Sequence, residues 1–547
     1  MKSSGIGEIR VWTRRAVQIA ALLLFLGLFL AVRMRPGWAP DWTAKLFFLL
    51  DPLILVATLL SAHAVPALLL LALVTVVATA LLGRVFCGWI CPFGTMHAIA
   101  GRVLGWIRPA RKTSQAFSPW QRAKYYVLAG FLVMAALGGH WVCAWDPIVL
   151  LTRSCAAAFF PGAQWMVEEG SKAVYDSEHR IGPLKVSDVT DVPYVFLRDH
   201  VFGVPTLSFI GGGALLAIVL ALLLLNGVRR RFWCRYVCPL GALLGLVAWR
   251  PALRRQVKKE ACNACDLCGI ACAGGAAAAP GDRWMPTECL VCLGCDAACR
   301  REGLGFAWSW PLTWEPAVER LDLSKRALAA SAAGGLLGLC LMRITPQARG
   351  TVFHPDLIRP PGSRPEREFL QRCLACGLCF KACPTGGLQP AWSEAGLEGL
   401  WTPRLVPSIG YCDYTCNLCG QACPTEAIRP LPLEEKQRVK IGLARFDTTR
   451  CIPYAYGREC IVCEEVCPLP KKAIYAVETE VALRDGARVK LKQPRVDPDL
   501  CTGCGICEYV CPFRDQPAVK VFSANESRHP KANQPILPES GRGTDPY

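Results

Sequence analysis

The chain has 547 residues, 52% of them hydrophobic, and its mean hydropathy of +0.29 is high for a soluble protein of this length. The formal net charge of +18 does not indicate a nucleic-acid-binding protein, because the basic residues crowd beside apolar runs, as the positive-inside rule describes for membrane proteins. Most of the 31 cysteines recur at short, regular intervals, which excludes a disulfide scaffold.

Apolar runs fill the first part of the chain. After a short basic start, four of them approach the length that a helix needs to cross a bilayer. A shorter apolar run, residues 46–60, contains Asp51-Pro52, and we interpret it as a re-entrant or interfacial segment. The predicted spans are residues 16–32, 64–83, 125–143 and 206–226.

The charges between these runs predict an orientation. Residues 84–124 carry seven Lys and Arg and no acid, and residues 227–260 carry nine against one Glu. Residues 144–205 carry five Lys and Arg against eight acids. The positive-inside rule therefore places the N-terminus and both basic segments in the cytoplasm, and residues 144–205 outside.

An internal repeat links the two halves of this region. Each copy reads C-x3-C-P, directly follows a predicted span, and is preceded further back by an Asp-Pro pair. A pseudo-twofold arrangement would bring the four thiols together at the cytoplasmic surface. Such a set would form a metal or cluster site, a seventh beside the six described below, or a redox-active dithiol pair near a quinone pocket. The alternative is that these turns only shape the junction between the membrane and the cytoplasm. The cysteines are Cys87, Cys91, Cys234 and Cys238.

Three polar residues beside the apolar runs are candidates for a quinone site. Asp51 and Asp146 each precede a proline, and Asp at the N-cap with Pro in the first turn is an ordinary helix start. The sharper hypothesis is that an acid beside an apolar run takes a quinol proton. His97 lies six residues after Cys91, although a histidine at a membrane edge is more often a packing residue.

Residues 262–299 hold two cysteine runs of the form C-x2-C-x2-C-x3-C. Bacterial ferredoxins use this run for [4Fe-4S] clusters, with the fourth cysteine reaching the neighbouring cluster, whereas zinc sites normally use separated cysteine pairs. We therefore expect the two fourth cysteines, Cys272 and Cys299, to exchange clusters, although neither is followed by the usual proline. The runs are Cys262, Cys265, Cys268 and Cys272, then Cys289, Cys292, Cys295 and Cys299.

Residues 324–344 combine a basic start, Lys325-Arg326, with a weakly apolar stretch of small residues. This segment resembles a twin-arginine-type export signal that is retained as a fifth span. Because clusters are inserted inside the cell, the following domain would cross the membrane already folded. The alternative is a buried helix, with the C-terminal domain remaining inside the cell.

Four further cysteine runs follow. Two keep the ferredoxin spacing, and two open with wider gaps of three and eight residues. With the two earlier runs they account for 24 of the 31 cysteines, so six [4Fe-4S] clusters are expected. The runs are Cys373, Cys376, Cys379 and Cys383; Cys412, Cys416, Cys419 and Cys423; Cys451, Cys460, Cys463 and Cys467; and Cys501, Cys504, Cys507 and Cys511.

The C-terminal motifs resemble NapG-type ferredoxins. Besides the cysteine runs, the resemblance is carried by Arg359-Pro-Pro-Gly362, by Gly442-Leu-Ala444, and by Pro517-Ala-Val-Lys-Val521. The first 300 residues, with their spans, C-x3-C-P turns and two-cluster tail, resemble the NapH-type membrane partner. The chain thus resembles a fusion of two proteins that pass electrons from quinol to a periplasmic nitrate reductase.

This resemblance, together with the crossing of fourth cysteines, implies a nested pairing of the four C-terminal runs. The first run would pair with the fourth, and the second with the third. Cys511 would then join the run of Cys373, and Cys383 the run of Cys501. Cys467 would join the run of Cys412, and Cys423 the run of Cys451.

We therefore predict an α-helical membrane domain with four to five spans and an internal repeat, followed by α+β tandem ferredoxin-like domains. The membrane domain covers residues 1–250, and a two-cluster ferredoxin domain covers residues 251–323. An export-like fifth span at 324–345 and a four-cluster domain at 346–523 follow. The polar tail, residues 524–547, is expected to be disordered.

Clusters of this kind carry electrons, and the sequence has no C-x-x-C-H haem motif, P-loop or Rossmann fingerprint. Our first hypothesis is a quinol dehydrogenase, multi-pass in a bacterial inner membrane with its C-terminal domain in the periplasm. It would pass electrons from the quinone pool to a periplasmic c-type cytochrome or terminal reductase. The second is an electron donor for metal-site maturation or maintenance, as in the NosR and RdxA/CcoG types. The third is an electron-transfer subunit of a larger redox complex.

Overall fold

The computed structural model describes residues 5–32, 42–107, 115–177, 180–181, 184–202, 207–258, 260–263, 265–276, 284–301, 303–309, 321–344, 354–482 and 488–528. The chain folds into two compact units, each assembled from separate stretches of sequence. The first unit comprises residues 1–31, 42–159 and 211–341, and the second comprises residues 32–41, 160–210 and 342–547. The predicted domain boundaries stay a prediction, and most of the predicted tail lies outside the described residues.

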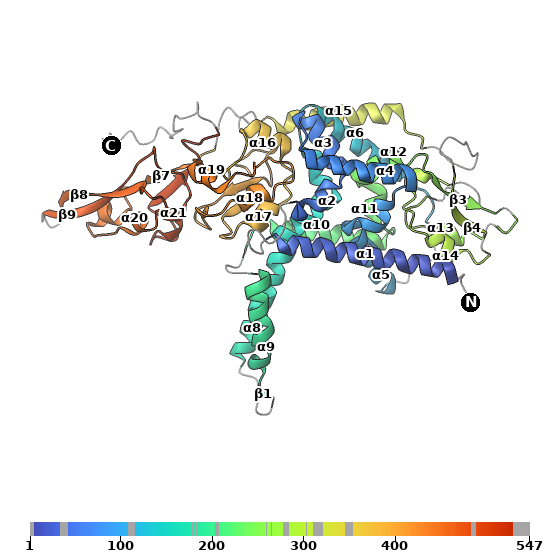
Figure 1. Ribbon diagram of the computed structural model, residues 1–547, viewed down its shortest axis with the longest axis horizontal. Coiled ribbons are helices and arrows are strands. Elements are labelled where there is room, and N and C mark those ends of the chain that lie inside the picture. The colour runs from blue at the N-terminus through green and yellow to red at the C-terminus, as the bar shows by residue number, and fades with distance from the viewer. Residues whose placement is uncertain are drawn as a thin grey trace. The chain divides into compact units, whose positions relative to one another are not determined.

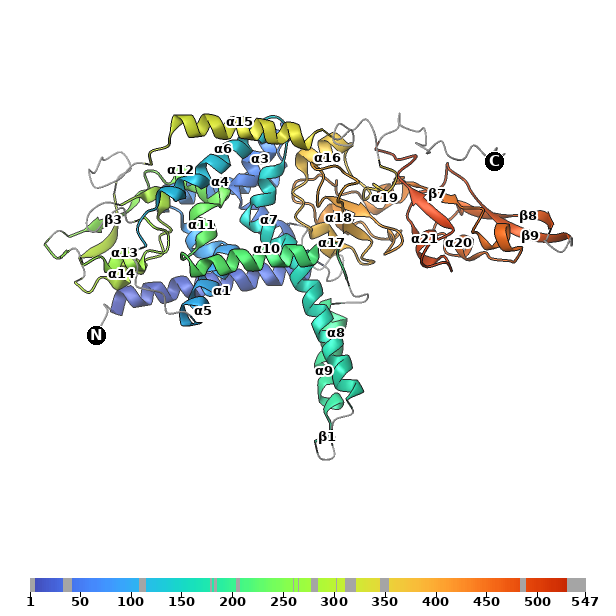
Figure 2. The same cartoon turned by 180° about the vertical axis from the view of Figure 1, so that it is seen from behind.

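Helices form most of the first unit, as Figure 1 and the reverse view in Figure 2 show. Their sequences are rich in Leu, Ala and Val, and many of their side chains remain exposed in the protein, as expected of helices that face lipid. The longer helices are α1 (Gly5–Ala31), α3 (Pro52–Ala62), α4 (Ala72–Leu82), α5 (Pro92–Ile107), α6 (Ala123–Ala136), α7 (Pro147–Ser154), α10 (Gly212–Leu224), α12 (Pro239–Val247) and α15 (Lys325–Met342).

The prediction of four to five membrane spans is wrong. By length and composition, two helices among the described residues could cross a membrane, or three if one bent pair is a single span. The two are Gly7–Ala31, within α1, and α15. The bent pair joins Thr43–Leu49 to Pro52–Ala62 at an angle of 83°, which is the geometry expected of the predicted re-entrant segment.

Turns shorten the helices in the other predicted spans. Pro66 lies inside the predicted second span, and the apolar helix that follows it covers only Ala67–Leu82. In the third span, α6 ends at Ala136, and Gly138 follows with a φ of 86°, a left-handed conformation that stops a helix. In the fourth span, α10 begins only at Gly212.

The internal repeat is visible in how the helices begin. The Asp51 side chain accepts the backbone N–H groups at the start of α3, and the Asp146 side chain does the same for α7. The helix-capping interpretation of both Asp-Pro pairs is therefore confirmed. Cys91 and Cys238 are also equivalent, since each precedes a proline and its sulfur accepts the N–H of the residue three positions on.

A small ferredoxin-like fold closes the first unit. Strand β3 (Leu253–Val257) pairs antiparallel with β4 (Leu304–Trp308), and the two short helices α13 (Leu267–Ala271) and α14 (Gly294–Ala298) pack against each other. Each of these helices begins inside a cysteine run. The segment predicted to be a two-cluster ferredoxin thus combines one strand pair with one pair of short helices.

The second unit contains a helical hairpin of α8 (Phe160–Asp176) and α9 (Val186–Leu197), followed by a cysteine-rich domain. The cysteine-rich domain has three antiparallel pairs, β5 (Leu388–Pro390) with β6 (Pro403–Leu405), β7 (Leu443–Phe446) with β10 (Val519–Phe522), and β8 (Ile474–Ala482) with β9 (Arg488–Val496). Its short helices are α17 (Leu378–Ala382), α18 (Leu418–Gln421), α20 (Val462–Glu465) and α21 (Ile506–Val510). Its hydrophobic core includes cysteines from three of the runs, and partly buried cysteines of the run that begins at Cys412 pack against this core.

Candidate iron-sulfur cluster sites

In the first unit, the structure pairs the cysteines of the two runs as the crossing rule predicts. The first three cysteines of the first run and Cys299 line one cavity of about 300 Å³. Cys272 instead lies near Cys289 and Cys295 of the second run, close enough for its charge to interact with theirs. The expected exchange of fourth cysteines is therefore confirmed for this domain.

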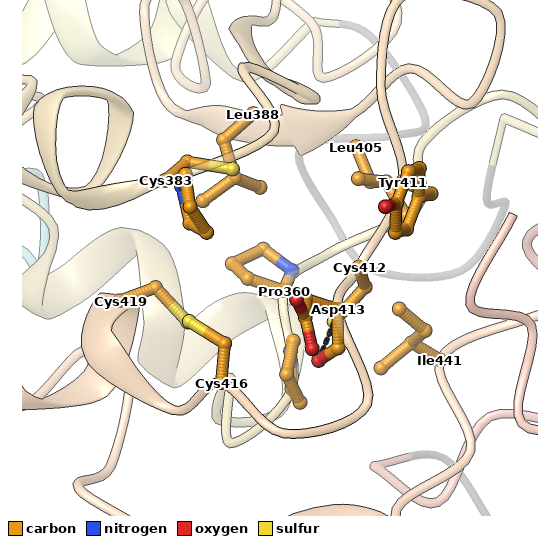
Figure 3. Close-up of a pocket in the computed structure, with 12 residues that line it drawn as sticks. Pro360, Cys383, Leu388, Leu405, Tyr411, Cys412, Asp413, Cys416, Cys419 and Ile441 are labelled. Atoms are coloured by element: carbon orange, nitrogen blue, oxygen red, sulfur yellow. Dashed lines mark hydrogen bonds between the residues drawn. The ribbon is translucent and has the colours of Figure 1, made fainter. Parts of the chain in front are cut away.

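The second unit brings Cys383 to the run that begins at Cys412. Both line one small pocket together with Cys416 and Cys419, as Figure 3 shows. In return, Cys423 lies near Cys373 and Cys379 of the first C-terminal run, close enough for its charge to interact with theirs. The first two C-terminal runs thus exchange their fourth cysteines.

The last two runs repeat this arrangement. Cys511 lines a pocket with Cys451, Cys460 and Cys463. Cys467 lies near Cys501 and Cys504, since it acts on the charge of both sulfurs. The third and fourth runs therefore exchange their fourth cysteines as well.

The nested pairing that we inferred for the C-terminal domain is wrong. The reason is that short helices carrying the third cysteines pack in consecutive pairs, α17 with α18 and α20 with α21. The turn after each helix therefore delivers the fourth cysteine to its immediate neighbour. The domain consists of two successive two-cluster ferredoxins, joined by contacts such as the hydrogen bond from Cys412 N–H to the carbonyl of Cys504.

The cysteine groups fit [4Fe-4S] clusters better than single metal ions. Among the described residues, no three His, Cys, Asp or Glu side chains are placed to hold one metal ion. A cube spreads its four thiolates over four irons, so its ligands stand further apart than those of zinc. Burial raises the pKa of the Cys289, Cys373 and Cys412 thiols to about 12. These thiols need a bound metal centre to lose their protons at neutral pH.

The four cysteines of the C-x3-C-P turns converge, as the internal repeat predicts. All four are buried, and Cys238 lies close enough to the other three for their charges to interact. Arg231 also reaches the first turn, where its Nη1 donates to the carbonyl oxygen of Cys87 over 3.0 Å. The described part of the chain offers no grouping for a single metal ion here either.

The three quinone-site candidates fall into two places. Asp51 and Asp146 are fully buried, and their carboxyl groups lie close enough for their charges to interact. His97 lies on a separate cavity, whose lining residues do not include either aspartate. The Asn226 amide donates to the Nδ1 atom of His97 over 2.7 Å, and His97 Nε2 has no hydrogen-bond partner among the described residues.

The cavity beside His97 has a volume of about 680 Å³ and lies in the first unit. Its walls come from the N-terminal half of α1, from α5, and from the ferredoxin-like fold. Cys292 is the one cluster cysteine among its lining residues. The cavity is therefore separate from the space between the four cysteines of that cluster site, Cys272, Cys289, Cys292 and Cys295. Sequence reasoning missed the other lining side chains, including Trp12, Arg14 and Trp106. The available signal was the spacing of Trp and Arg by three or four residues on two helices, as in Trp12 and Arg15.

Comparisons with known proteins identify 4Fe-4S binding domains in parts of the chain. A family model described as a 4Fe-4S binding domain matches residues 64–113 and 212–260, which contain both C-x3-C-P turns, and a second model of that description matches residues 493–516. No solved structure matches the chain.

Three relatives have names that refer to electron transfer or to ferredoxins. The methylamine utilization ferredoxin-type protein MauM of Paracoccus denitrificans is 36% identical over 34% of this chain and 78% of its own length. The ferredoxin-type protein NapG of Escherichia coli is 35% identical over 37% of this chain and 82% of its own length. The putative electron transport protein YccM of Escherichia coli is 27% identical over 48% of this chain and 60% of its own length.

The MauM and NapG matches cover more than two thirds of those proteins. The likeness of the first 300 residues to NapH-type proteins stays a prediction. With paired cysteine runs, 4Fe-4S binding domains and these relatives, the chain belongs to the family of ferredoxin-type iron–sulfur proteins that includes MauM and NapG.

Proposed function

We propose that this protein oxidises quinol at a bacterial inner membrane and passes the electrons through its clusters to a periplasmic cytochrome or reductase. The single observation that carries this proposal is that His97 and Cys292 line the same cavity. A hydrogen-bonding group for a quinone oxygen and a ligand of a cluster thus meet in a space large enough for an aromatic head group.

Asn226 orients the histidine in this cavity. Its amide nitrogen donates to the carbonyl of Leu223 and to His97 Nδ1, while its amide oxygen accepts the N–H of Phe232. These contacts determine which end of the Asn226 side-chain amide is the nitrogen and which is the oxygen. They make His97 Nδ1 an acceptor. The neutral imidazole then carries its proton on Nε2, the atom left to bind an oxygen of the substrate.

The surroundings of the cavity suit a lipid-soluble substrate. Helix α1 supplies one wall and contains one of the two candidate membrane spans. On the other wall, the cluster held by Cys272, Cys289, Cys292 and Cys295 would supply a one-electron acceptor when bound. The two-cluster ferredoxins of the second unit would then carry electrons towards the acceptor protein.

The test is anaerobic mixing of the purified full chain, with clusters loaded, with a soluble quinol analogue. We expect the visible absorbance of the clusters to bleach, and we expect His97→Gln to slow this reduction about tenfold or more, as removal of a positioned catalytic group does. His354→Gln, in the second unit, is the control. Clusters that are reduced by dithionite but not by any quinol would refute the proposal.

A further inference from the structure

The cavity beside His97 is lined by an unusual number of guanidinium groups. Its arginines are Arg14, Arg15, Arg102, Arg230 and Arg231, and the acid among its lining residues is Glu8. Arg14 is 9% exposed, and Arg231, Arg15 and Arg102 are all close enough to act on its charge. Like charges gathered at a partly buried site repel one another, so this arrangement favours an anion as its ligand.

Several donors in this cavity have no acceptor within the protein. The Nε atoms of Arg14 and Arg15 are buried and have no hydrogen-bond partner among the described residues. The same holds for Nε2 of His97, whose side chain is fully buried and whose neutral form carries a proton on that atom. These buried donors belong to residues of the cavity wall and have no acceptor of their own, which favours a negatively charged oxygen over a hydroxyl group that must itself donate.

Aromatic side chains accompany the arginines. Trp12 and Trp106 line the same cavity, and the guanidinium of Arg15 stacks over the Trp12 ring at 5.0 Å from its centroid. Flat aromatic and guanidinium surfaces suit a flat ligand. A phosphate group, the other common ligand of clustered arginines, would leave these indole surfaces unused.

From these features we infer that the cavity binds its quinol as the deprotonated anion, with the negative oxygen held by the arginines and by the Nε2–H of His97. The inference rests on the proposed function and deepens it. The first proton of the quinol leaves to water before binding. Oxidation of the bound anion then releases the second proton to water and two electrons, which pass singly to the oxidised clusters and leave the quinone as product.

The cluster itself offers a competing explanation for the arginines. Arg14 lies near Cys292, so these guanidinium groups could serve only to balance the charge of the bound cluster. That arrangement predicts that removing an arginine shifts the reduction potential of the cluster and leaves ligand binding unchanged. Binding and potential therefore have to be measured on the same variants.

The test uses two naphthoquinones of nearly equal shape on the oxidised, cluster-loaded full chain. Hydroxynaphthoquinone is an anion at pH 7, and methoxynaphthoquinone is neutral. Quenching of tryptophan fluorescence reports binding, and Trp106→Phe establishes which part of the signal arises in the cavity. We expect the anion to bind about tenfold or more tightly than the neutral probe, as charge-assisted hydrogen bonds require.

Arg14→Gln and Arg102→Gln should each reduce this preference by about threefold or more, since each removes one of several cationic groups. Arg10→Gln is the matched control, because Arg10 lies on the same helix but pairs with Asp296 outside the cavity lining. Equal affinities for the two probes would overturn the inference. So would an affinity unchanged by the cavity variants while the cluster potential shifts, or displacement of the probe by millimolar inorganic phosphate.

The two proposals fail in different ways. Equal probe affinities, with cluster reduction by quinol intact, would overturn the anionic form of the substrate and leave quinol oxidation standing. Tight and selective binding of the anion, with no reduction of the clusters by any quinol, would support the anion site and refute quinol oxidation.

Discussion

The ammonium group of Lys124 lies 2.5 Å from the carboxylate of Glu288, and both side chains are fully buried. Glu288 also accepts a hydrogen bond from the hydroxyl of Tyr125 and lies 3.6 Å from the guanidinium of Arg84. Lys124 and Tyr125 belong to α6, whereas Glu288 directly precedes Cys289, a cluster cysteine. This buried ionic group therefore connects the helices of the first unit to its ferredoxin-like fold.

Glu288→Ala should destabilise the first unit severely. The substitution leaves Lys124 and Arg84 buried without their counter-charge, which costs about 3–5 kcal/mol for a buried ion pair that loses one partner. Urea unfolding in detergent, followed by tryptophan fluorescence, would measure the change. Glu260→Ala, at an exposed position of the same fold, is the control, and a similar effect of the two substitutions would contradict the role given to Glu288.

The pairing of cysteine runs predicts how pairs of substitutions combine. Cys383→Ala and Cys412→Ala remove ligands from the same cluster, so the double variant should lose about four irons, the same as either single variant. Cys383→Ala with Cys501→Ala removes ligands from two clusters and should lose about eight irons. Anaerobic iron analysis distinguishes these outcomes. The reverse result, with loss of one cluster in the second pair, would restore the nested pairing.

Glu366 predicts a dependence of stability on pH in the second unit. Burial by itself raises the pKa of Glu366, but the guanidinium groups of Arg359 and Arg528, at 2.5 and 2.6 Å, lower that pKa to about 2. Because the folded pKa lies below the ordinary value of 4.5, the ionised form stabilises the protein above about pH 4.5. This contribution is lost as the pH falls from there towards 2.

Urea unfolding of the wild type and Glu366→Gln at several pH values would measure this contribution. We expect a difference of about 3 kcal/mol that is nearly constant from pH 8 to pH 5 and smaller by about 1 kcal/mol at pH 4. Glu368→Gln, on a more exposed glutamate of the same helix, should have a much smaller effect. A difference that grows on acidification would show that the sign is wrong.

Two neighbouring glycines of α15 should respond to alanine with opposite signs. A Cβ atom at Gly335 would collide with the backbone oxygen of Gly130 on α6, whereas a Cβ at Gly334 would meet nothing within 4 Å. Gly335→Ala should therefore separate the helices and destabilise the protein by about 1–3 kcal/mol. Gly334→Ala should stabilise it by about 0.5–1 kcal/mol, through helix propensity alone. Thermal unfolding of both variants tests this contrast, and a loss of equal size in the two would contradict it.

The sequence by itself was sufficient to identify the cysteine chemistry and the internal repeat. Cysteine spacing is a local property, because three thiols on one short loop are brought together by the loop itself. The starts of α3 and α7 were predictable for a similar reason, since Asp51 and Asp146 cap helices through their own neighbouring backbone.

Hydropathy was a weaker guide to the number of spans. A run of apolar residues measures composition, but the length of the helix also depends on turns such as those at Pro66 and Gly138. Composition therefore predicted more spans than the helices support.

Only the tertiary structure decided which residues meet across long stretches of chain. The fourth cysteine of each run has no local partner, so the destination of Cys383 depends on how α17 packs against α18. Likewise, Arg14, His97 and Cys292 come from three distant segments, and no local pattern connects them. Their meeting in one cavity depends on the packing of α1 and α5 against the ferredoxin-like fold, which is set by contacts distributed over the whole first unit.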